Sequence, residues 1–410
     1  MQKTSIIRSD DLRNENRRRL LNTLRLEGPS TPSKLSSITG LSAASISTLS
    51  SQMIDQGILA SERYQIDRTK PLRGRPRSLL SLCPDAGHVL TLTLTIDLIR
   101  VQLVDYAGTI LDSHQEIVDT RRLDVEQLLA TICQGIDLLC RQHPDIQLLH
   151  IGVGFQGQTE HVSGKLLWSP IIQQRKVPLG KTLQARYKVS VSVHNDCRLI
   201  AQALSRRHTD VLGQTFATVL YGHGVGLGLY LNGQPFAGTR SSAMEIGHLR
   251  FVKNGALCRC GRRGCIEAYA ADYGIERQAR GLSTETPPAG RVAPASMKAL
   301  RAAAVAGDCA TRQAFETAGT AIGEGLCHVF TLLDPIPVAM VGCSDDTYEL
   351  MRSSICEALD ARLNNGPSAD SLLHRFGYDD PLLVQGLADN SLSAVDSLLA
   401  IRNTVTANAR

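Results

Sequence analysis

Residues 243–267 read AMEIGHLRFVKNGALCRCGRRGCIE and bring one histidine and three cysteines close together in the chain. The four residues are His248, Cys258, Cys260 and Cys265. They offer an imidazole and three thiolates, the ligand number of a closed tetrahedral zinc site, and two glycines let the short loop turn around an ion. Because four protein ligands leave no open coordination position, we expect one structural zinc ion per chain.

A redox or disulfide role is the alternative for this cysteine loop. Cys258 and Cys260 are too close in sequence to form an easy disulfide with each other, and a cytosolic chain keeps its thiols reduced. The other eight of the eleven cysteines stand singly in apolar or helical segments and are expected to be buried thiols. They are Cys83, Cys133, Cys140, Cys197, Cys309, Cys327, Cys343 and Cys356.

Positive charge is concentrated at the start of the chain. The net charge is +5 overall, but residues 1–80 hold 14 Lys and Arg against 7 Asp and Glu, a balance of +7, which leaves −2 for the rest. Such asymmetry is typical of a nucleic-acid-binding end, although a solvated basic face is the alternative.

Three helices are expected in this basic segment. The first covers residues 9–27, and the second follows the hydroxyl cap and proline of Thr31-Pro32. Ser42 caps a third helix that Gly57 ends. A short helix, a glycine-containing turn and a helix with small and hydroxyl residues facing outward form the helix-turn-helix pattern. A helical bundle without a ligand is the alternative, but the basic first helix and the strand and basic loop that follow favour DNA binding.

The third helix and the basic loop supply the predicted DNA contacts. The helix residues are Ser42, Ala44, Ser45, Ser47, Thr48 and Ser51. Arg73, Arg75 and Arg77 follow in a loop at the position of a wing, where an extended Arg-Gly-Arg-Pro can enter a narrow minor groove. A basic interdomain linker is the alternative for this loop, and in a wing position the two interpretations coincide.

From about residue 85 onward, apolar runs alternate with helical patterns, which indicates an α/β fold. Strands are expected at 89–96, 101–104, 109–112, 148–155, 189–194, twice within 215–231, and at 338–342, with helices at 123–142, 196–207 and 297–333. The expected domains are a winged helix-turn-helix at 1–84, a first α/β lobe at 85–194, and a second α/β lobe with the zinc loop at 195–410. The C-terminal helices are free to return to the first lobe.

Residues 243–267, which include the four predicted zinc ligands, resemble the signature of the ROK family of repressors, open reading frames and kinases. Further support comes from residues 151–157, 168–170, 193–196, 221–228 and 333–335. The N-terminal extension resembles the repressor branch, so the resemblance covers nearly the whole chain. It implies a two-lobed, sugar-kinase-like sensor domain of the actin and hexokinase type, preceded by an all-α winged helix-turn-helix domain.

The resemblance also implies a cleft that binds a sugar or sugar phosphate. The implied effector-binding residues are Asn195, Asp196, Glu245, His248 and Glu267. Asp196 stands at the place of the kinases' catalytic base, and zinc would hold Glu245 and Glu267 in position. Amides and carboxylates suit vicinal hydroxyls. As alternatives, an Asn-Asp pair after a strand is more often a turn or helix cap, and an isolated Glu is usually solvated.

Departures from the kinase pattern are as informative. The kinases carry Gly-Gly-Thr after the aspartate of the first strand, because glycines let backbone amides approach phosphate. Here Asp97 is followed by Leu98-Ile99-Arg100, so we expect no phosphoryl transfer and no catalytic residues. Ile171 and His194 also differ from residues common in sugar-binding members, which leaves the identity of the effector open.

These features predict a DNA-binding transcriptional regulator of carbohydrate metabolism, normally a repressor. A homodimer or homotetramer on operator DNA is expected, because one helix-turn-helix reads only a half-site. The alternatives are an active ATP-dependent sugar kinase, motivated by Asp196, and a regulator controlled by a protein partner instead of a sugar. No stretch approaches the roughly 20 apolar residues of a membrane span, and the N-terminus lacks a signal peptide's apolar core, so a cytoplasmic protein without membrane insertion is expected.

Overall fold

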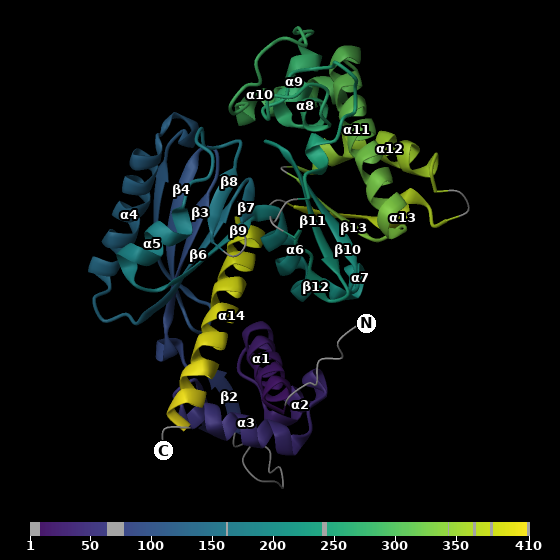
Figure 1. Ribbon diagram of the computed structural model, residues 1–410. Coiled ribbons are helices and arrows are strands. Elements are labelled where there is room, and N and C mark those ends of the chain that lie inside the picture. The colour runs from purple at the N-terminus through teal and green to yellow at the C-terminus, as the bar shows by residue number, and fades with distance from the viewer. Residues whose placement is uncertain are drawn as a thin grey trace.

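The computed structural model describes residues 9–63, 78–160, 163–239, 244–342, 344–363, 366–377 and 380–407. Three bodies follow one another: an N-terminal, mainly helical unit and two α/β lobes, each built on a five-stranded sheet (Figure 1). One long C-terminal helix, α14 (Asp380–Ala407), runs from the lobes down to the N-terminal unit (Figure 1).

The N-terminal unit begins with three helices whose ends follow from local sequence. They are α1 (Ser9–Glu27), α2 (Pro32–Thr39) and α3 (Ala43–Asp55). The Thr31 hydroxyl accepts a hydrogen bond from the backbone of Lys34, and Ser42 caps α3 in the same way. Gly40 ends α2 with a φ of 70°, a left-handed conformation that suits glycine. The helix-turn-helix therefore lies where the sequence predicts it.

The expected all-α character of this unit needs one correction. Strands β1 (Leu59–Arg63) and β2 (Ser78–Leu82) pair in antiparallel fashion. Leu59, Leu80 and Leu82 are buried in the same core as the three helices, because alternate residues of a strand face one side. The connection at residues 64–77, which includes Arg73, Arg75 and Arg77, lies outside the described residues.

The first lobe contains a mixed sheet covered by helices. Its strands are β3 (His88–Leu94), β4 (Leu98–Asp105), β5 (Ile110–Ile117), β6 (Leu148–Phe155) and β9 (Ser190–Asn195), in the order β5-β4-β3-β6-β9. The first three strands are antiparallel neighbours, and β6 and β9 run parallel to β3. Helices α4 (Val125–Gln142) and α5 (Leu179–Tyr187) pack in this lobe, and β7 (Gln158–Glu160) and β8 (Lys165–Trp168) form a small hairpin.

The second lobe repeats the same strand order. Its strands are β10 (Phe216–Tyr221), β11 (Val225–Leu231), β12 (Gln234–Pro235), β13 (Val338–Gly342) and β14 (Leu373–Gly377), in the order β12-β11-β10-β13-β14. Its helices are α6 (Asp196–Arg207), α7 (Thr209–Leu212), α8 (Glu267–Ala270), α9 (Asp272–Ala279), α10 (Pro294–Val305), α11 (Cys309–Leu333), α12 (Asp345–Asp360) and α13 (Ala369–Leu372). Three strands of each sheet are parallel: β3, β6 and β9 in the first lobe, and β10, β13 and β14 in the second. Their carboxyl ends therefore meet at one edge of each sheet, the usual place for a binding site.

Helix α14 packs against elements of every body. It contacts β3 and β6 of the first sheet, α6 of the second lobe and α1 of the N-terminal unit. Leu387 joins the apolar cluster around α6, whereas Leu392 and Val395 join the cluster that contains the N-terminal helices. The C-terminal helix therefore contacts all three bodies and contributes to two apolar clusters.

Candidate functional site: a cleft beside a four-ligand metal group

A cleft of about 510 Å³ lies where the two lobes meet. Its lining residues come from the carboxyl ends of β3 and β9 in the first lobe, the start of β11, and the loops around the metal group in the second lobe. All five residues that the sequence predicts as effector-binding line this cleft: Asn195, Asp196, Glu245, His248 and Glu267. The fold thus brings together side chains from two distant parts of the chain.

The four predicted metal ligands form one group. The donor atoms of His248, Cys258, Cys260 and Cys265 all lie within 4.8 Å of one another. Cys260 Sγ and Cys265 Sγ are 3.7 Å apart, and Cys258 Sγ is 3.6 Å from His248 Nδ1. A tetrahedral zinc ion with Zn–S bonds of about 2.3 Å separates two sulfurs by about 3.8 Å, and a sulfur from an imidazole nitrogen by about 3.5 Å. The spacing and the chemistry of the donors both fit zinc.

The other described cysteines lie outside the metal group. Cys197 and Cys327 are buried, but Cys83, Cys133, Cys140 and Cys356 are only half-buried and Cys309 is exposed. The prediction of buried thiols is therefore wrong for Cys309, because it opens α11 and faces solvent, and too strong for the half-buried four. Cys343 lies outside the described residues.

The metal group fixes two carboxylates at the cleft. His248 turns Nδ1 toward Cys258 and Nε2 toward Glu245, whose Oε2 is 3.4 Å away. Glu267 opens α8 two residues after Cys265, and its Oε1 accepts a hydrogen bond of 3.2 Å from the Tyr273 hydroxyl. Burial raises the pKa of Glu245 above its usual value. The positions of the Glu245 and Glu267 carboxylates therefore depend on the position of the cysteine loop.

Asn195 and Asp196 enter the cleft from the β9–α6 turn. The Asn195 side chain caps α6 by accepting from Arg198 N and donates to the carbonyl of Gly157, so the helix-cap alternative describes part of its role. Asp196 is 5% exposed and accepts a bond of 2.8 Å from Cys197 N. Burial and, to a smaller extent, the nearby Glu245 carboxylate raise the pKa of Asp196 to about 6. A hydroxyl donor in the cleft would find this carboxylate held in one orientation.

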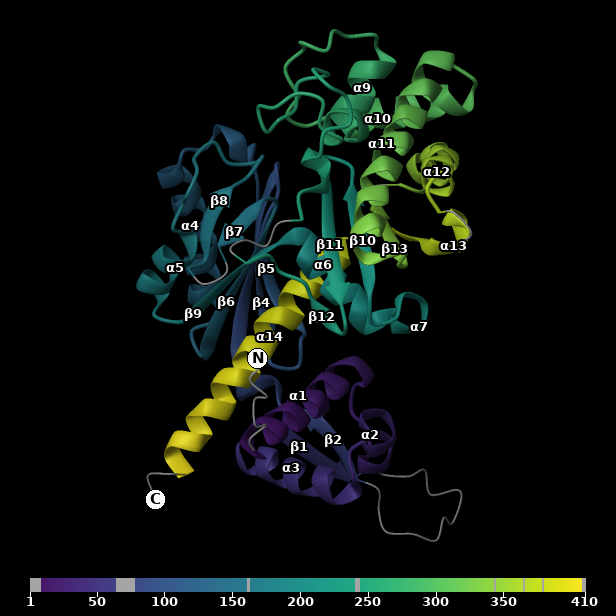
Figure 2. The ribbon, with the colours of Figure 1, turned by 45° about the vertical axis from the view of Figure 1, so that its right-hand side comes forward.

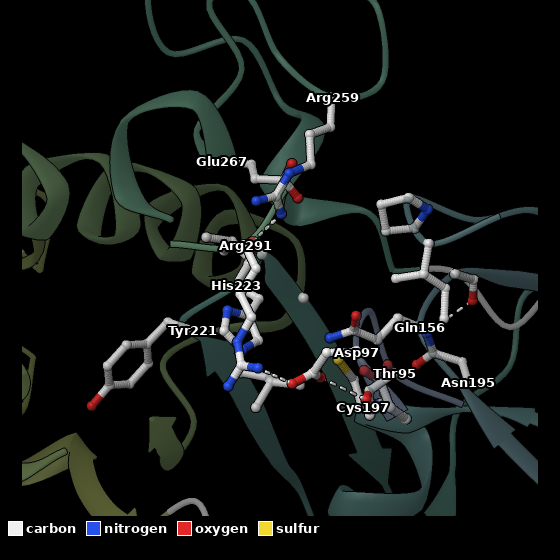
Figure 3. A pocket seen from close by; sticks show the side chains of 18 of the residues that line it. Thr95, Asp97, Gln156, Asn195, Cys197, Tyr221, His223, Arg259, Glu267 and Arg291 are labelled. Carbon is white, nitrogen blue, oxygen red and sulfur yellow. Dashed lines mark hydrogen bonds and ion pairs between the residues drawn. The ribbon is translucent and has the colours of Figure 1, made fainter. Parts of the chain in front are cut away.

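The turn that departs from the kinase pattern is occupied by an ion pair between the lobes. Asp97, at the β3–β4 turn, pairs with Arg291 from the loop before α10 (Figure 3). A Cβ at Gly290 would overlap the Arg121 guanidinium, so the same loop touches the first lobe a second time. Leu98 and Arg100 also line this end of the cleft, where bulky side chains replace the small residues of a phosphate loop.

Arg259 and Trp168 line the cleft but are not among the site residues that the sequence predicts. Arg259 lies over the Tyr273 ring and donates to the carbonyls of Ala289, Gly290 and His223, which ties the cysteine loop to the loop that carries Arg291 (Figure 3). Trp168 lines the cleft with its ring edge-on to His248 at 5.3 Å. The sequence offers two signals for them: Arg259 stands between the predicted metal ligands, and Trp168 begins the stretch 168–170 that supports the family resemblance.

The predicted DNA-contacting residues of α3 lie on its outer face. Ser42, Ala44, Ser47, Thr48 and Ser51 are exposed, and Ser45 is half-exposed. Buried Ile46, Leu49 and Met53 occupy the other face. Contact with DNA stays a prediction for these residues, and for the three loop arginines outside the described ranges.

The basic residues of α1 have an additional structural use. Arg13 donates to Gln52 and Arg17 donates to Gln56, both at the far end of α3. Arg19 donates to the carbonyl of Thr39 at the end of α2. Part of the basic character that suggests DNA binding therefore braces the helix-turn-helix itself.

The fold and the cleft define a class of protein: a two-lobed, sugar-kinase-like domain with a His/Cys cluster that could bind a metal ion, preceded by a winged helix-turn-helix. Residues 92–380 match the family model described as the ROK family, and the chain belongs to this family. Among the described residues, no helix has both the length and the apolar composition that a membrane crossing requires.

Its curated relatives include two repressors. The xylose repressor of Bacillus subtilis (strain 168) is 23% identical over 376 residues, which cover 90% of this chain and 93% of that protein. The N-acetylglucosamine repressor of Escherichia coli O157:H7 is 25% identical over 322 residues, or 77% of each chain. Both relatives are matched over most of their length.

Solved structures of the family share the fold. A ROK family transcriptional regulator described as a homolog of the E. coli MLC protein superposes with a TM-score of 0.75 at 22% identity, covering 95% of this chain and 98% of that one. A ROK family glucokinase from Streptomyces griseus, in complex with glucose and AMPPNP, gives 0.58 at 22% identity, covering 74% of this chain and 99% of its own. The regulator thus matches almost the whole chain, whereas the kinase leaves a larger part of it unmatched.

Proposed function

We propose that this protein is a DNA-binding transcriptional regulator, a repressor of carbohydrate metabolism, whose operator affinity responds to a sugar or sugar phosphate in the cleft. One observation carries the proposal: a helix-turn-helix with an exposed polar face on α3 shares a hydrophobic core with the domain that holds the cleft. Relatives that are named xylose and N-acetylglucosamine repressors agree with it.

The cleft suits a polyol and not a phosphoryl donor. Carboxylates and an amide at its inner side accept hydroxyl hydrogens, and two of these carboxylates are fixed by the metal loop. Asp97, which would face the phosphates in a kinase, is instead neutralised by Arg291. At the far end a Cβ at Gly342 would overlap the Tyr221 ring, so an aromatic side chain fills space beside β13. We therefore assign the cleft to sensing.

The zinc ion belongs to this proposal as a structural cofactor, one per chain. When bound, zinc would supply a rigid tetrahedral link between the loop after Glu245 and the start of α8. We also propose that the chain works as a homodimer or homotetramer on operator DNA, because a single helix-turn-helix covers only a half-site.

The effector is tested with the one tryptophan as an internal probe. Trp168 is the only tryptophan of the chain and lines the cleft, so its emission reports ligand binding. We would titrate D-xylose, D-glucose, N-acetyl-D-glucosamine and the 6-phosphates of the two hexoses, and measure emission and Tm. A true effector at 100 times its Kd should stabilise the protein by about 2.7 kcal/mol.

Variants separate the cleft from unspecific effects. Glu245→Ala and Asp196→Ala should abolish the response, and Glu126→Ala, an exposed carboxylate on α4, should preserve it. If no sugar or cell extract shifts the wild type while operator binding is normal, a protein partner becomes the better hypothesis. Sugar-dependent ADP formation that disappears in Asp196→Asn would instead establish the kinase.

A further inference from the structure

Helix α14 carries two buried aspartates, and each is paired with arginine from a different body. Asp389 Oδ2 accepts from Arg207 at 3.1 Å and lies 3.4 Å from Arg206, both on α6. Asp396 accepts two hydrogen bonds from Arg25 of α1, at 2.6 and 2.8 Å. The two carboxylates are two helical turns apart, about 10 Å along the axis. One rigid helix thus joins the second lobe to the DNA-binding unit.

The Asp396 end is a buried polar network inside an apolar core. The side chains of Arg25 and Asp396 are each 4% exposed. Tyr106, from the turn after β4, donates to the same carboxylate, and the Arg25 guanidinium lies 5.0 Å over its ring. A buried bidentate pair has one well-defined geometry, because any displacement leaves desolvated charge without a partner. The network therefore fixes the positions of helix α1, the first lobe and α14 relative to one another.

The other end of α14 is fixed on α6 by close backbone packing. A Cβ at Gly386 would overlap the carbonyl oxygen of Leu199, so the two helices touch without an intervening side chain. Asn390 adds a hydrogen bond of 3.2 Å to Gln202 of α6. Since α6 begins at Asp196 in the cleft, its first turn lies at the proposed effector site, and Arg206 and Arg207 of its last turn pair with Asp389. Figure 2 shows α6 beside α14.

We propose that α14 is the transmission element of the regulator: a shift of α6 at the cleft moves α14 through Asp389, and α14 moves α1 through the Arg25–Asp396–Tyr106 network. This inference rests on the proposed function and adds the path of regulation to it. Motion of a packed rigid element between discrete arrangements is an established way to couple distant sites. The competing explanation is that each contact stabilises only its own surroundings and does not couple the cleft to α1.

Hydrogen–deuterium exchange on the full-length, zinc-loaded protein separates these explanations without sugar or DNA. The test variant combines Arg25→Met with Asp396→Leu, which removes both charges and preserves apolar volume. If α14 transmits, amide exchange should rise by about tenfold in α6 as well as around Arg25, and Trp168 emission should change. Conversely, Asp389→Asn should accelerate exchange in the second half of α1.

A second test variant and a control variant keep the exchange experiment interpretable. Tyr106→Phe removes one hydroxyl only, and should give the same pattern at about threefold if the double variant is poorly folded. Ser397→Ala is the control, because this side chain bonds only within α14, and should match the wild type. Exchange changes confined to α1 and the second half of α14, with α6 and Trp168 as in the wild type, would overturn the transmission path. Because no effector or operator is used, this result is independent of whether the proposed function holds.

Discussion

Cys260 is the metal ligand whose replacement gives the clearest test of the zinc site. We expect purified wild-type protein to carry about one zinc per chain. Cys260→Ser should weaken zinc binding by more than the roughly 10–100-fold that loss of an outer-shell partner brings. Elemental analysis and zinc-dependent Tm measure both effects. Cys309→Ser, at an exposed thiol outside the group, is the control and should keep its zinc. Freshly prepared wild type without zinc would contradict the assignment.

Asp196 should make stability depend on pH. Burial raises its pKa from 3.8 to about 6, so the folded protein holds a proton that the unfolded chain has released between these values. This stabilisation is complete below pH 3.8 and is lost as the pH rises through about 6. For these two pKa values the wild type loses about 1.4 kcal/mol between pH 5 and pH 8.

Asp196→Asn removes this titration and should therefore gain stability relative to the wild type as the pH rises. Urea unfolding at pH 5 and pH 8 measures the difference in the free energy of unfolding. Asp145→Asn, at an exposed carboxylate outside the cleft, serves as the control. Parallel curves for Asp196→Asn and the wild type would show that the carboxylate is not desolvated as described.

At the scale of single residues, the sequence predicts what is local and misses what is not. The four metal donors fall within 18 consecutive residues, so their spacing alone indicates one site. Asp97 and Arg291 meet only because two lobes close on each other. The residues after Asp97 mark it as a departure from the kinase pattern, but nothing in the sequence indicates Arg291 as its partner. The cap made by Asn195 follows from its type and place, whereas its second bond, to Gly157, follows from the fold.

Helix α3 is the element that the proposed function depends on most. Its outer face has no charged side chain between Ser42 and Ser51. Affinity for DNA should therefore come from hydroxyl contacts of α3 and from the loop arginines Arg73, Arg75 and Arg77. Thr48→Ala should weaken binding to DNA selected by the protein from a random pool, by about 1–3 kcal/mol if the hydroxyl reads a base. Arg75→Ala should instead weaken binding to all sequences and reduce the salt slope by about 1.

Fluorescence anisotropy at several salt concentrations distinguishes these two effects. Thr131→Ala is the matched control for Thr48→Ala, because its hydroxyl also lies on a helix but bonds only within α4. Unchanged affinity in both variants, with folding intact, would remove α3 and the loop from the DNA interface.

Elements were more predictable than their partners in space. Residues 148–155 and 196–207 form a strand and a helix with the expected bounds, because each carries a strong apolar period and a clear end signal. The sequence predicts a strand after α3 but not its pairing with β2, since a basic loop separates the two strands and a short strand does not indicate its partner. The local spacing of apolar residues thus determines whether a segment forms a helix or a strand, and packing in the core determines which element it pairs with.

At the scale of the whole molecule, the least predictable feature is the path of α14. Arg25 and Asp396 are 371 positions apart, and nothing in either neighbourhood indicates the contact. The helix is shared because the apolar surfaces of all three bodies converge on it in two clusters, so its sequence must satisfy two cores at once. This convergence places the cleft and the DNA-binding helices within reach of one rigid element.

The same convergence leads to a prediction about regulation. A wild-type effector should change operator affinity by about 5–150-fold, the range of typical allosteric coupling. In the Arg25→Met, Asp396→Leu variant this ratio should fall toward 1, because the link from α14 to α1 is removed while no residue of the cleft is replaced. The variant should still bind the sugar, as a titration followed by Trp168 emission measures, and Ser397→Ala should keep the full response. Since coupling is reciprocal, operator DNA should also lose its effect on sugar affinity in the variant. A variant that still binds both ligands and retains the wild-type ratio would mean that the signal reaches the helix-turn-helix by another route, such as the direct connection between β2 and β3.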